Sequence, residues 1–281
     1  MKKKILSLCL VVALAATAVI GGTLAYFTDT EDEINVFALG NIVIDLVEEQ
    51  REYNQDGTVA GLEEFEDNKV LLPIVGSAQG EKENVGGYNL PTAENWVDKI
   101  VTVDNEGPQD AYVRVLFAFP AKMDDAQSAA EMMLHWNYDG SEAAGTWTRT
   151  DCGVTVTLGG EKYNVYNYTY NPILTKKNTD GATTASPAIT GVYIDKRVDA
   201  TVDADGSITY TMVNGRKETV SATYAKDTAP KLYVLTQGVQ AAGFEAQGAD
   251  AALTAGFGAV TKENAQTWFN AVTTGEREDI K

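Results

Sequence analysis

Apolar and polar residues alternate along much of the chain, and this pattern predicts β-strands. Across Ile34–Leu46 every even-numbered position is apolar or glycine, whereas the odd-numbered positions are mixed. A period of two is typical of a strand with one buried face, and Gly40 is expected to mark a bend or bulge. Trp96–Val103 and Asp110–Phe119 form the best-patterned pair of strands, joined by a predicted turn at 104–109.

Short strands recur through the rest of the chain and are separated by turn residues. Asp205-Gly206 and Asn214-Gly215 are typical of two-residue hairpin turns. Lys231–Val239 predicts a long final strand. Val70–Val75 is expected to be an edge strand or the end of a strand, because it contains Pro73. The other expected strands are Thr146–Arg149, Val154–Leu158, Tyr163–Tyr170, Gly191–Ile194, Ser207–Val213 and Glu218–Tyr224, with loops at Gly76–Asn95 and Lys177–Pro187.

Helical spacing is limited to three segments. Apolar residues recur every three or four positions in Ala121–Trp136. Ala246–Ala255 and Lys262–Val272 are expected to be short terminal helices, with Thr261 capping the second. Because strands dominate, at intervals of about 8–12 residues, the sequence predicts an all-β fold. The expected architecture is a jelly-roll-like antiparallel β-sandwich with one or two inserted or terminal short helices.

The N-terminus has the three parts of a secretory signal peptide. Lys2–Lys4 lead into the apolar run Ile5–Ile20, and small residues precede a sharp change in polarity after Ala25. The apolar run is shorter than the about 20 residues of a bilayer span. We therefore expect residues 1–25 to be a signal peptide cleaved after Ala25, or after Tyr26. An uncleaved N-terminal anchor is the alternative.

Cleavage would divide the chain into an N-terminal arm, residues 26–40, and a β-sandwich domain, residues 41–281, with an insertion around 121–229.

The mature chain is strongly acidic. The sequence has 22 Lys and Arg against 40 Asp and Glu, and loss of the three leader lysines gives a net charge of about −21. This charge repels nucleic acid and opposes self-association unless salt, acid or divalent cations screen it.

Cysteine chemistry is restricted by the same cleavage. Only Cys152 remains in the mature chain, so an intrachain disulfide cannot form. A buried, inert thiol is the expected state of this residue, and pairing between chains is the alternative.

Three segments carry a family resemblance. The first joins Gly21–Asp29, at the end of the leader, to Val36–Leu46. The second is a strand and an Asn-x-Gly turn, Val101–Gly107, followed by an Ala-Tyr-Val-Arg-Val strand, Ala111–Val115. The third is Val239–Phe244. Together they resemble the TasA/camelysin family of exported bacterial proteins. The resemblance implies a jelly-roll sandwich, secretion to the extracellular matrix or bacterial cell surface, biofilm-matrix fibres, and leader removal by a specialised SipW-type signal peptidase.

The resemblance also implies a way to assemble. In such fibres the freed N-terminal segment of one subunit adds as a strand to the open sheet edge of the next, which places the donor strand at residues 26–39. Burial of Phe27, Ile34, Val36 and Phe37 would contribute roughly 6–12 kcal/mol, against an association cost on the order of 4–15 kcal/mol. Assembly is therefore expected to be conditional. A charged terminus without fixed structure is the alternative.

Candidate catalytic residues are few. Some members of this family are described as metalloproteases, but His135 is the only histidine, with Glu131 four residues before it. A zincin needs two histidines one helical turn apart, and catalytic zinc usually has three protein ligands. His135 is therefore expected to be structural, and nothing local supports a thiol protease built from His135 and Cys152. We expect no catalytic residues and no enzymatic activity.

Two turns offer oxygen ligands for calcium, Asp104–Gly107 and Asp203–Gly206, but neither completes a twelve-residue calcium loop. Hairpin turns with solvated acids are the simpler interpretation, so no metal or cofactor is predicted, with calcium left open.

Four tyrosines are expected to line a sheet face or core wall rather than a sugar-binding platform. They are Tyr163, Tyr166, Tyr168 and Tyr170.

The sequence as a whole predicts a secreted structural subunit of an extracellular matrix or cell-surface fibre. Its expected partners are other copies of itself, the specialised signal peptidase during export, and other matrix proteins or the cell surface, but not nucleic acid. Two alternatives belong to other functional classes. One is a monomeric cell-surface binding or adhesion module, and the other is a camelysin-like exported metalloprotease.

Overall fold

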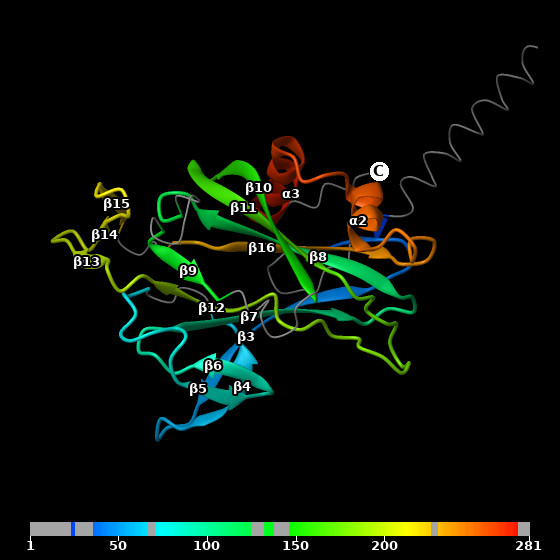
Figure 1. The fold of residues 1–281 in the computed structure, drawn as a ribbon, viewed down its shortest axis with the longest axis horizontal. Coiled ribbons are helices and arrows are strands. Elements are labelled where there is room, and N and C mark those ends of the chain that lie inside the picture. The colour runs from blue at the N-terminus through cyan, green and yellow to red at the C-terminus, as the bar shows by residue number, and fades with distance from the viewer. Residues whose placement is uncertain are drawn as a thin grey trace, which may run out of the picture.

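The computed structural model describes residues 24–25, 36–66, 71–124, 132–137, 146–225 and 230–274. Two large sheets pack face to face as a sandwich (Figure 1). The six-stranded sheet has the order β1-β2-β16-β8-β11-β10 and is antiparallel except between β2 and β16. Its strands are β1 (Leu24–Ala25), β2 (Val36–Leu39), β8 (Ala111–Pro120), β10 (Trp147–Leu158), β11 (Glu161–Tyr170) and β16 (Tyr233–Gln240).

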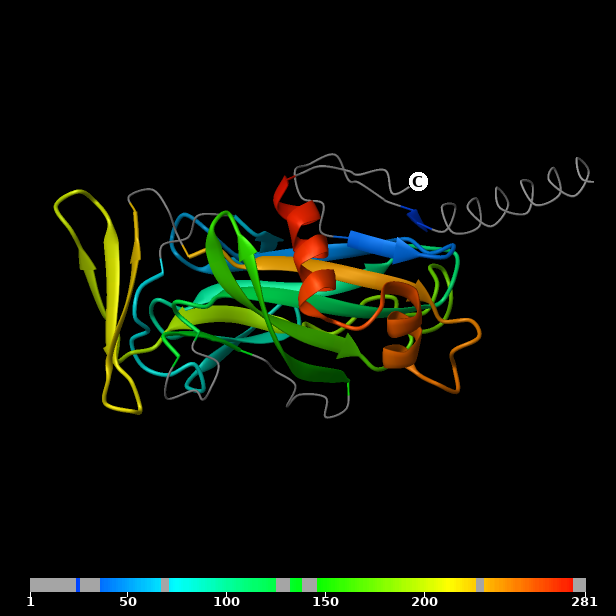
Figure 2. The same ribbon diagram turned by 90° about the horizontal axis from the view of Figure 1, so that it is seen from above.

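The second large sheet and two small sheets complete the β-structure. The five-stranded sheet has the order β4-β3-β7-β12-β9, while β13-β14-β15 and β5-β6 form sheets of their own. The three-stranded sheet projects at one end of the sandwich (Figure 2). The strands are β3 (Ile44–Tyr53), β4 (Val59–Glu64), β5 (Lys82–Val85), β6 (Tyr88–Pro91), β7 (Val97–Asn105), β9 (Leu134–Trp136), β12 (Ile189–Ile194), β13 (Asp199–Val202), β14 (Ile208–Val213) and β15 (Thr219–Tyr224). The predicted all-β fold is confirmed.

The main core lies between the two large sheets. Alternate residues of β7 and β8, such as Val103 and Phe117, meet there and are fully buried. Aromatic rings fill the middle of the core. Trp136 stacks on Phe119 with ring centroids 3.9 Å apart and donates a 2.6 Å hydrogen bond to the hydroxyl of Tyr168. Burial of large rings with their polar atoms satisfied stabilises the sandwich strongly.

Two helices cover the outer face of the six-stranded sheet, α2 (Ala249–Phe257) and α3 (Lys262–Thr274) (Figure 2). Leu253 of α2 packs near Tyr112, and Phe269 of α3 packs near Leu116. Both predicted terminal helices are confirmed. Thr261 caps α3 as expected, because its Oγ1 accepts a 3.2 Å hydrogen bond from the amide of Asn264.

The best-patterned strands do not pair with each other. β7 lies in the five-stranded sheet and β8 in the six-stranded sheet, so residues 104–109 form a corner between sheets rather than a hairpin. The Asn105 side chain fixes this corner by donating to the carbonyl oxygens of Gln109, Leu174 and Thr175. Gly107 passes so close to the link between β2 and β3 that an added Cβ would lie 2.4 Å from the amide nitrogen of Val43.

Three predictions about other segments are wrong. Leu134–Trp136 is a strand rather than the end of a helix, because it pairs with β12 and buries Trp136 in the core; residues 125–131 lie outside the described residues. The expected loop Gly76–Asn95 contains the β5–β6 hairpin. The segment 71–75, expected as part of an edge strand or strand end, makes only isolated bridges at Pro73 and Val75; Val70 lies outside the described residues.

Other predictions hold. The turns Asp205-Gly206 and Asn214-Gly215 join β13 to β14 and β14 to β15, but their loops are longer than the two residues predicted. The paired strands end at Val202 and Val213 and resume at Ile208 and Thr219. The two strands expected between residues 146 and 158 are one strand, β10, with a bulge between Asp151 and Val154.

Candidate assembly site

The N-terminal strand β2 lies beside the C-terminal strand β16, toward one edge of the six-stranded sheet. The two strands are parallel, with Val36 in register with Thr236 and Leu39 with Val239. On its other side β16 pairs with β8 along its whole length. β2 is therefore joined to the rest of the six-stranded sheet through β16 alone, with only the two-residue strand β1 beyond it.

Small residues let β2 sit close above the core. Ala38 is 3% exposed and belongs to the main core cluster, and its register partner is Gly238. A Cβ on Gly238 would lie 2.5 Å from Cδ1 of Ile44 and 3.1 Å from Cδ1 of Ile42. The space that a side chain at position 238 would occupy is thus filled by Ile42 and Ile44, which follow β2 in the chain.

A tight turn joins β2 to the rest of the molecule. Gly40 has a φ angle of +92°, and a Cβ there would lie 3.0 Å from Cβ of Gln240. Positive φ favours glycine strongly. After this turn the chain enters the opposite sheet at Ile44. The predicted strand Ile34–Leu46 is therefore two strands in two sheets, and the bend expected at Gly40 is confirmed.

The end of the predicted leader lies next to β2. Leu24 and Ala25 form β1, which pairs with Leu39 and Ala38. Of the predicted donor residues, Val36 and Phe37 belong to β2, whereas Phe27 and Ile34, with Tyr26 at the predicted cleavage site, lie outside the described residues. In a single chain, therefore, the C-terminal part of the predicted arm pairs with β16 of the same molecule.

The structure separates the residues considered for catalysis. His135 lies on β9 of one sheet and Cys152 on β10 of the other. The imidazole Nε2 is 3.1 Å from Oδ2 of Asp195, and burial lowers the pKa of His135 despite this partner. Burial also raises the pKa of the Cys152 thiol, which leaves it protonated and weakly nucleophilic at neutral pH. Glu131 lies outside the described residues.

Asp195 is held by the guanidinium of a neighbouring residue, Arg197. Arg197 donates to both of its carboxylate oxygens, at 2.8 Å and 2.6 Å. Burial acts to raise the pKa of Asp195, but the hydrogen bonds from Arg197 lower it to about 2. Within the described residues no three His, Cys, Asp or Glu side chains converge on a possible metal position.

In one of the two turns considered for calcium, Asp203–Gly206, the carboxylates accept local hydrogen bonds. The carboxylate of Asp205 accepts from Ser207 Oγ at 2.6 Å, and that of Asp203 accepts from Thr209 Oγ1 at 3.0 Å. These bonds are the usual means of closing a hairpin.

The tyrosines expected as a core wall are buried, and Tyr166, Tyr168 and Tyr170 face the main core. Tyr163 lies in the second core, under α3.

Sequence patterns missed two features of functional interest. The parallel pairing of β2 with β16 joins segments 200 residues apart, and local periodicity carries no information on such a contact. A polar hollow beside Arg51 and Trp96 was missed as well. Alternation along β3 does not indicate this hollow, because the adjacent polar residues Gln50 and Arg51 are both buried.

A known protein family matches the N-terminal part of the chain. Residues 1–52 match the family model of camelysin metallo-endopeptidases, which confirms the TasA/camelysin resemblance for the leader, β2 and nearly all of β3. A search of curated proteins found no match. Neither of the helices that the structure describes is long and apolar enough to cross a bilayer.

Proposed function

From the camelysin-family match of its first 52 residues, we propose that this chain is an exported structural subunit of an extracellular fibre. Subunits would join head to tail, with β2 of one copy taking the place of β2 in the next. The role proposed is structural and not catalytic. The observation that carries the proposal is the position of β2, a short N-terminal strand added in parallel to β16 and joined to the sandwich by the turn at Gly40.

Exchange of β2 between copies would preserve its contacts. A strand that leaves its own sheet exposes the edge of β16, and the identical strand of a neighbour restores the same hydrogen bonds and the buried position of Ala38. The register could also lengthen, because residues before Val36 would continue along Tyr233–Leu235 of the acceptor. Such pairing would add backbone hydrogen bonds between neighbouring copies.

The free-energy balance makes assembly conditional. A neighbour's β2 restores the contacts that are lost when a chain releases its own β2. Pairing beyond β2 must therefore offset the association cost, which is on the order of 4–15 kcal/mol. A processed N-terminus is needed for this pairing, because a leader still attached holds Leu24 and Ala25 against β2. Fibres are therefore expected from processed chains at high concentration.

Mixed cysteine variants test the exchange directly. Leu39 and Val239 are in register, so one chain would carry Leu39→Cys and another Val239→Cys, each with Cys152→Ser to remove the native thiol. Mild oxidation of fibres grown from the mixture should give covalent dimers on a denaturing gel. The same mixture kept dilute and monomeric should give none, because each chain then holds only one of the two cysteines.

The doubly substituted chain is the matched control. With Leu39→Cys and Val239→Cys in one molecule, oxidation of the monomer should close an internal disulfide and block fibre growth, and reduction should restore it. Fibres that yield only internal disulfides, or that grow equally well from the locked monomer, would show that β2 is not exchanged.

The family name favours a second candidate, an exported metallo-endopeptidase. It is separated from the structural role by incubating the processed protein with casein, with and without a chelator. We expect no chelator-sensitive cleavage. Electron microscopy of the same preparation separates fibres from the monomeric adhesion module that is the remaining alternative.

A further inference from the structure

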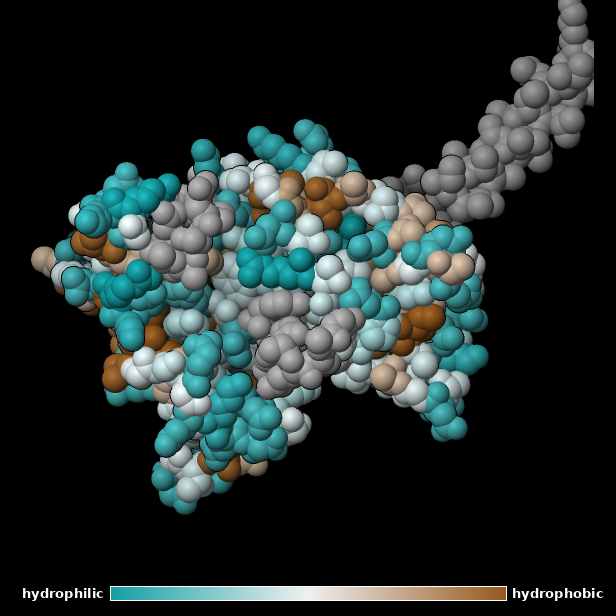
Figure 3. Space-filling model, in the orientation of Figure 1, coloured by the Kyte–Doolittle hydropathy of each residue, from teal (hydrophilic) through white to brown (hydrophobic). Residues whose placement is uncertain are grey.

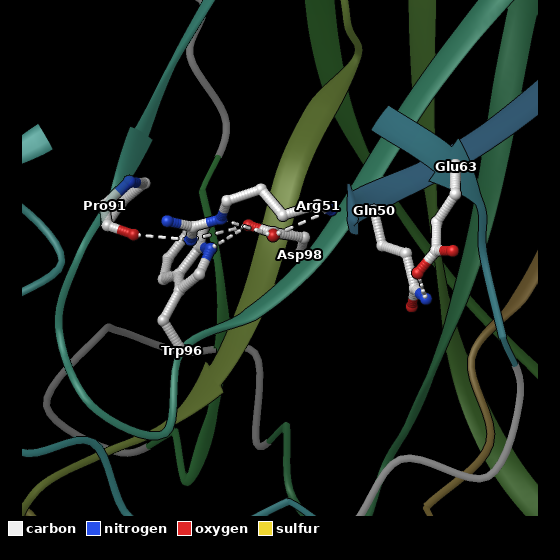
Figure 4. Close-up of polar contacts among 6 residues, drawn as sticks. All are labelled: Gln50, Arg51, Glu63, Pro91, Trp96 and Asp98. Atoms are coloured by element: carbon white, nitrogen blue, oxygen red, sulfur yellow. Dashed lines mark hydrogen bonds and ion pairs between the residues drawn. The ribbon is translucent and has the colours of Figure 1, made fainter. Parts of the chain in front are cut away.

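A buried ion pair forms the floor of a hollow at the end of the five-stranded sheet. The guanidinium of Arg51 donates to Asp98 through Nε, at 2.7 Å, and through Nη2, at 3.0 Å, and Nη2 also donates to the carbonyl of Pro91 at 2.6 Å (Figure 4). The two charged side chains are only 6% and 8% exposed. The positive charge of Arg51 is therefore cancelled by Asp98 within the floor.

The remainder of the floor is equally fixed. Trp96 donates its indole N–H to Asp98 at 2.8 Å and stacks on Tyr193 with ring centroids 5.7 Å apart. Asn95 has a positive φ angle of 64° and donates to the carbonyl of Pro73 at 2.9 Å. A ligand would find these groups already ordered, which lowers the entropic cost of binding.

The hollow above this floor has a volume of about 460 Å³, in the range of small-ligand sites. The β3–β4 turn, β5 and the segment before Trp96 enclose it. Glu83, Glu94 and Tyr53 stand at its walls. Tyr53 is 57% exposed, unusual for so large a ring. Glu83 and Glu94 are exposed; the main chain of Glu94 pairs with Val75, and the side-chain carboxylates of both glutamates border the hollow.

The chemistry of the hollow is asymmetric. Its walls carry two exposed carboxylates, of which Glu83 also attracts the Arg51 guanidinium. Its floor offers one donor, because the hydrogen bonds of the Arg51 guanidinium to the described residues use Nε and Nη2 and none uses Nη1 (Figure 4). A free anion would face the two glutamates, and a purely apolar group would leave the polar walls unsatisfied.

We propose that this hollow binds a lysine or arginine residue within an extended segment of a partner protein. The basic side chain would lie between Glu83 and Glu94 and against the ring of Tyr53, where charge and cation–π attraction act together. The main-chain carbonyl of the same residue would accept a hydrogen bond from Nη1 of Arg51. A basic residue in a peptide supplies both groups at once, and this inference does not depend on the exchange of β2.

Blocked tripeptides are suitable probes, titrated into the full mature chain and followed by NMR through the indole N–H of Trp96. Acetyl-Gly-Lys-Gly-amide and its arginine counterpart should shift this resonance with saturation in the millimolar range. The norleucine peptide, which keeps the aliphatic stem without the charge, and the glutamate peptide should not. The double variant Glu83→Gln/Glu94→Gln should weaken lysine-peptide binding at least fivefold.

A second double variant matches the change in net charge. Glu218→Gln/Glu263→Gln alters two exposed glutamates far from the hollow, and it should bind the lysine peptide as the unmodified chain does. Equal weakening in both double variants would reduce the effect to the overall charge of the protein. That result, equal binding of the norleucine peptide, or no shift of the Trp96 resonance would each overturn the proposal.

Discussion

At the scale of single residues, Gly107 marks where the chain turns from one sheet into the other. A Cβ at this position would lie 2.4 Å from the backbone nitrogen of Val43 and 3.1 Å from the carbonyl carbon of Ile42. Both atoms are main chain, so no side-chain rotation can relieve the contact. We expect Gly107→Ala to lower the free energy of unfolding by about 1–3 kcal/mol, measured by urea denaturation.

Gly61 provides the control for this substitution. It lies on β4 with no atom within 4 Å of a built Cβ and without a positive φ angle. Gly61→Ala should leave stability unchanged or raise it by up to about 1 kcal/mol. If both alanine variants behave alike, the corner at Gly107 is not as tightly packed as the structure shows.

His135 should make stability depend on pH in a defined direction. The imidazole is buried against Tyr193 and faces Asp195 and Arg197, and burial places its folded-state pKa below the value of about 6.5 for an exposed histidine. Below that pH the unfolded chain binds the extra proton more readily, so stability is lost as the pH falls. Asp195, with a pKa of about 2, changes only at lower pH.

The matched variant is His135→Gln, which keeps a polar side chain without a titrating group. Free energies of unfolding for both proteins, measured at pH 7.5 and pH 5.5, should show a larger loss in the unmodified chain. All other titrating groups are common to the two proteins and cancel in the comparison. Equal losses would show that His135 does not titrate differently in the folded and unfolded states.

At the scale of elements, α3 depends on one capping residue. Thr261 accepts a hydrogen bond from the amide of Asn264 at the first turn, and α3 covers the part of the six-stranded sheet around Leu116 and Phe269. Thr261→Ala should therefore cost about 1 kcal/mol of stability. Thr267→Ala, which removes a hydroxyl from an exposed position in the same helix, should cost less, as compared by thermal unfolding.

The strands and terminal helices were predictable because their signals are local. Alternation identified β7, β8, β11 and β16, and Asp-Gly and Asn-Gly identified two hairpins. Sheet membership was not predictable, since a strand such as β8 that is buried along its whole length gives no sign of which neighbour it has. The strand at Leu134–Trp136 was mistaken for helix because the spacing of its apolar residues fits both periods.

The candidate assembly site shows the same division. The sequence placed a strand after the leader and a bend at Gly40, both of which are local properties. It could not show that this strand pairs with β16 in its own chain, because the choice depends on the space that Gly238 leaves for Ile42 and Ile44. The same limit applies to the hollow over Arg51, whose walls come from β3, β5 and the segment before β7.

At the scale of the whole molecule, charge dominates the surface. Hydrophilic residues cover most of the face shown in Figure 3, and hydrophobic patches are small and separate. Exposed apolar residues of some size are few among the described residues, with Val202 and Val213 both on the projecting three-stranded sheet. Association through such patches alone is weak. The full sequence has a net charge of −18, so copies in the proposed fibre would have to approach against strong repulsion.

Fibre growth should therefore accelerate with ionic strength. At 0.01 M salt the Debye length is about 30 Å and whole molecules repel, whereas at 0.15 M it falls to about 8 Å and repulsion is confined to the contact region. Light scattering of the processed chain should rise faster at the higher salt. Sodium and calcium chloride compared at equal ionic strength then separate two causes: equal rates indicate screening alone, and a faster rate with calcium indicates bridging between carboxylates. A rate independent of salt would mean that charge repulsion does not limit assembly.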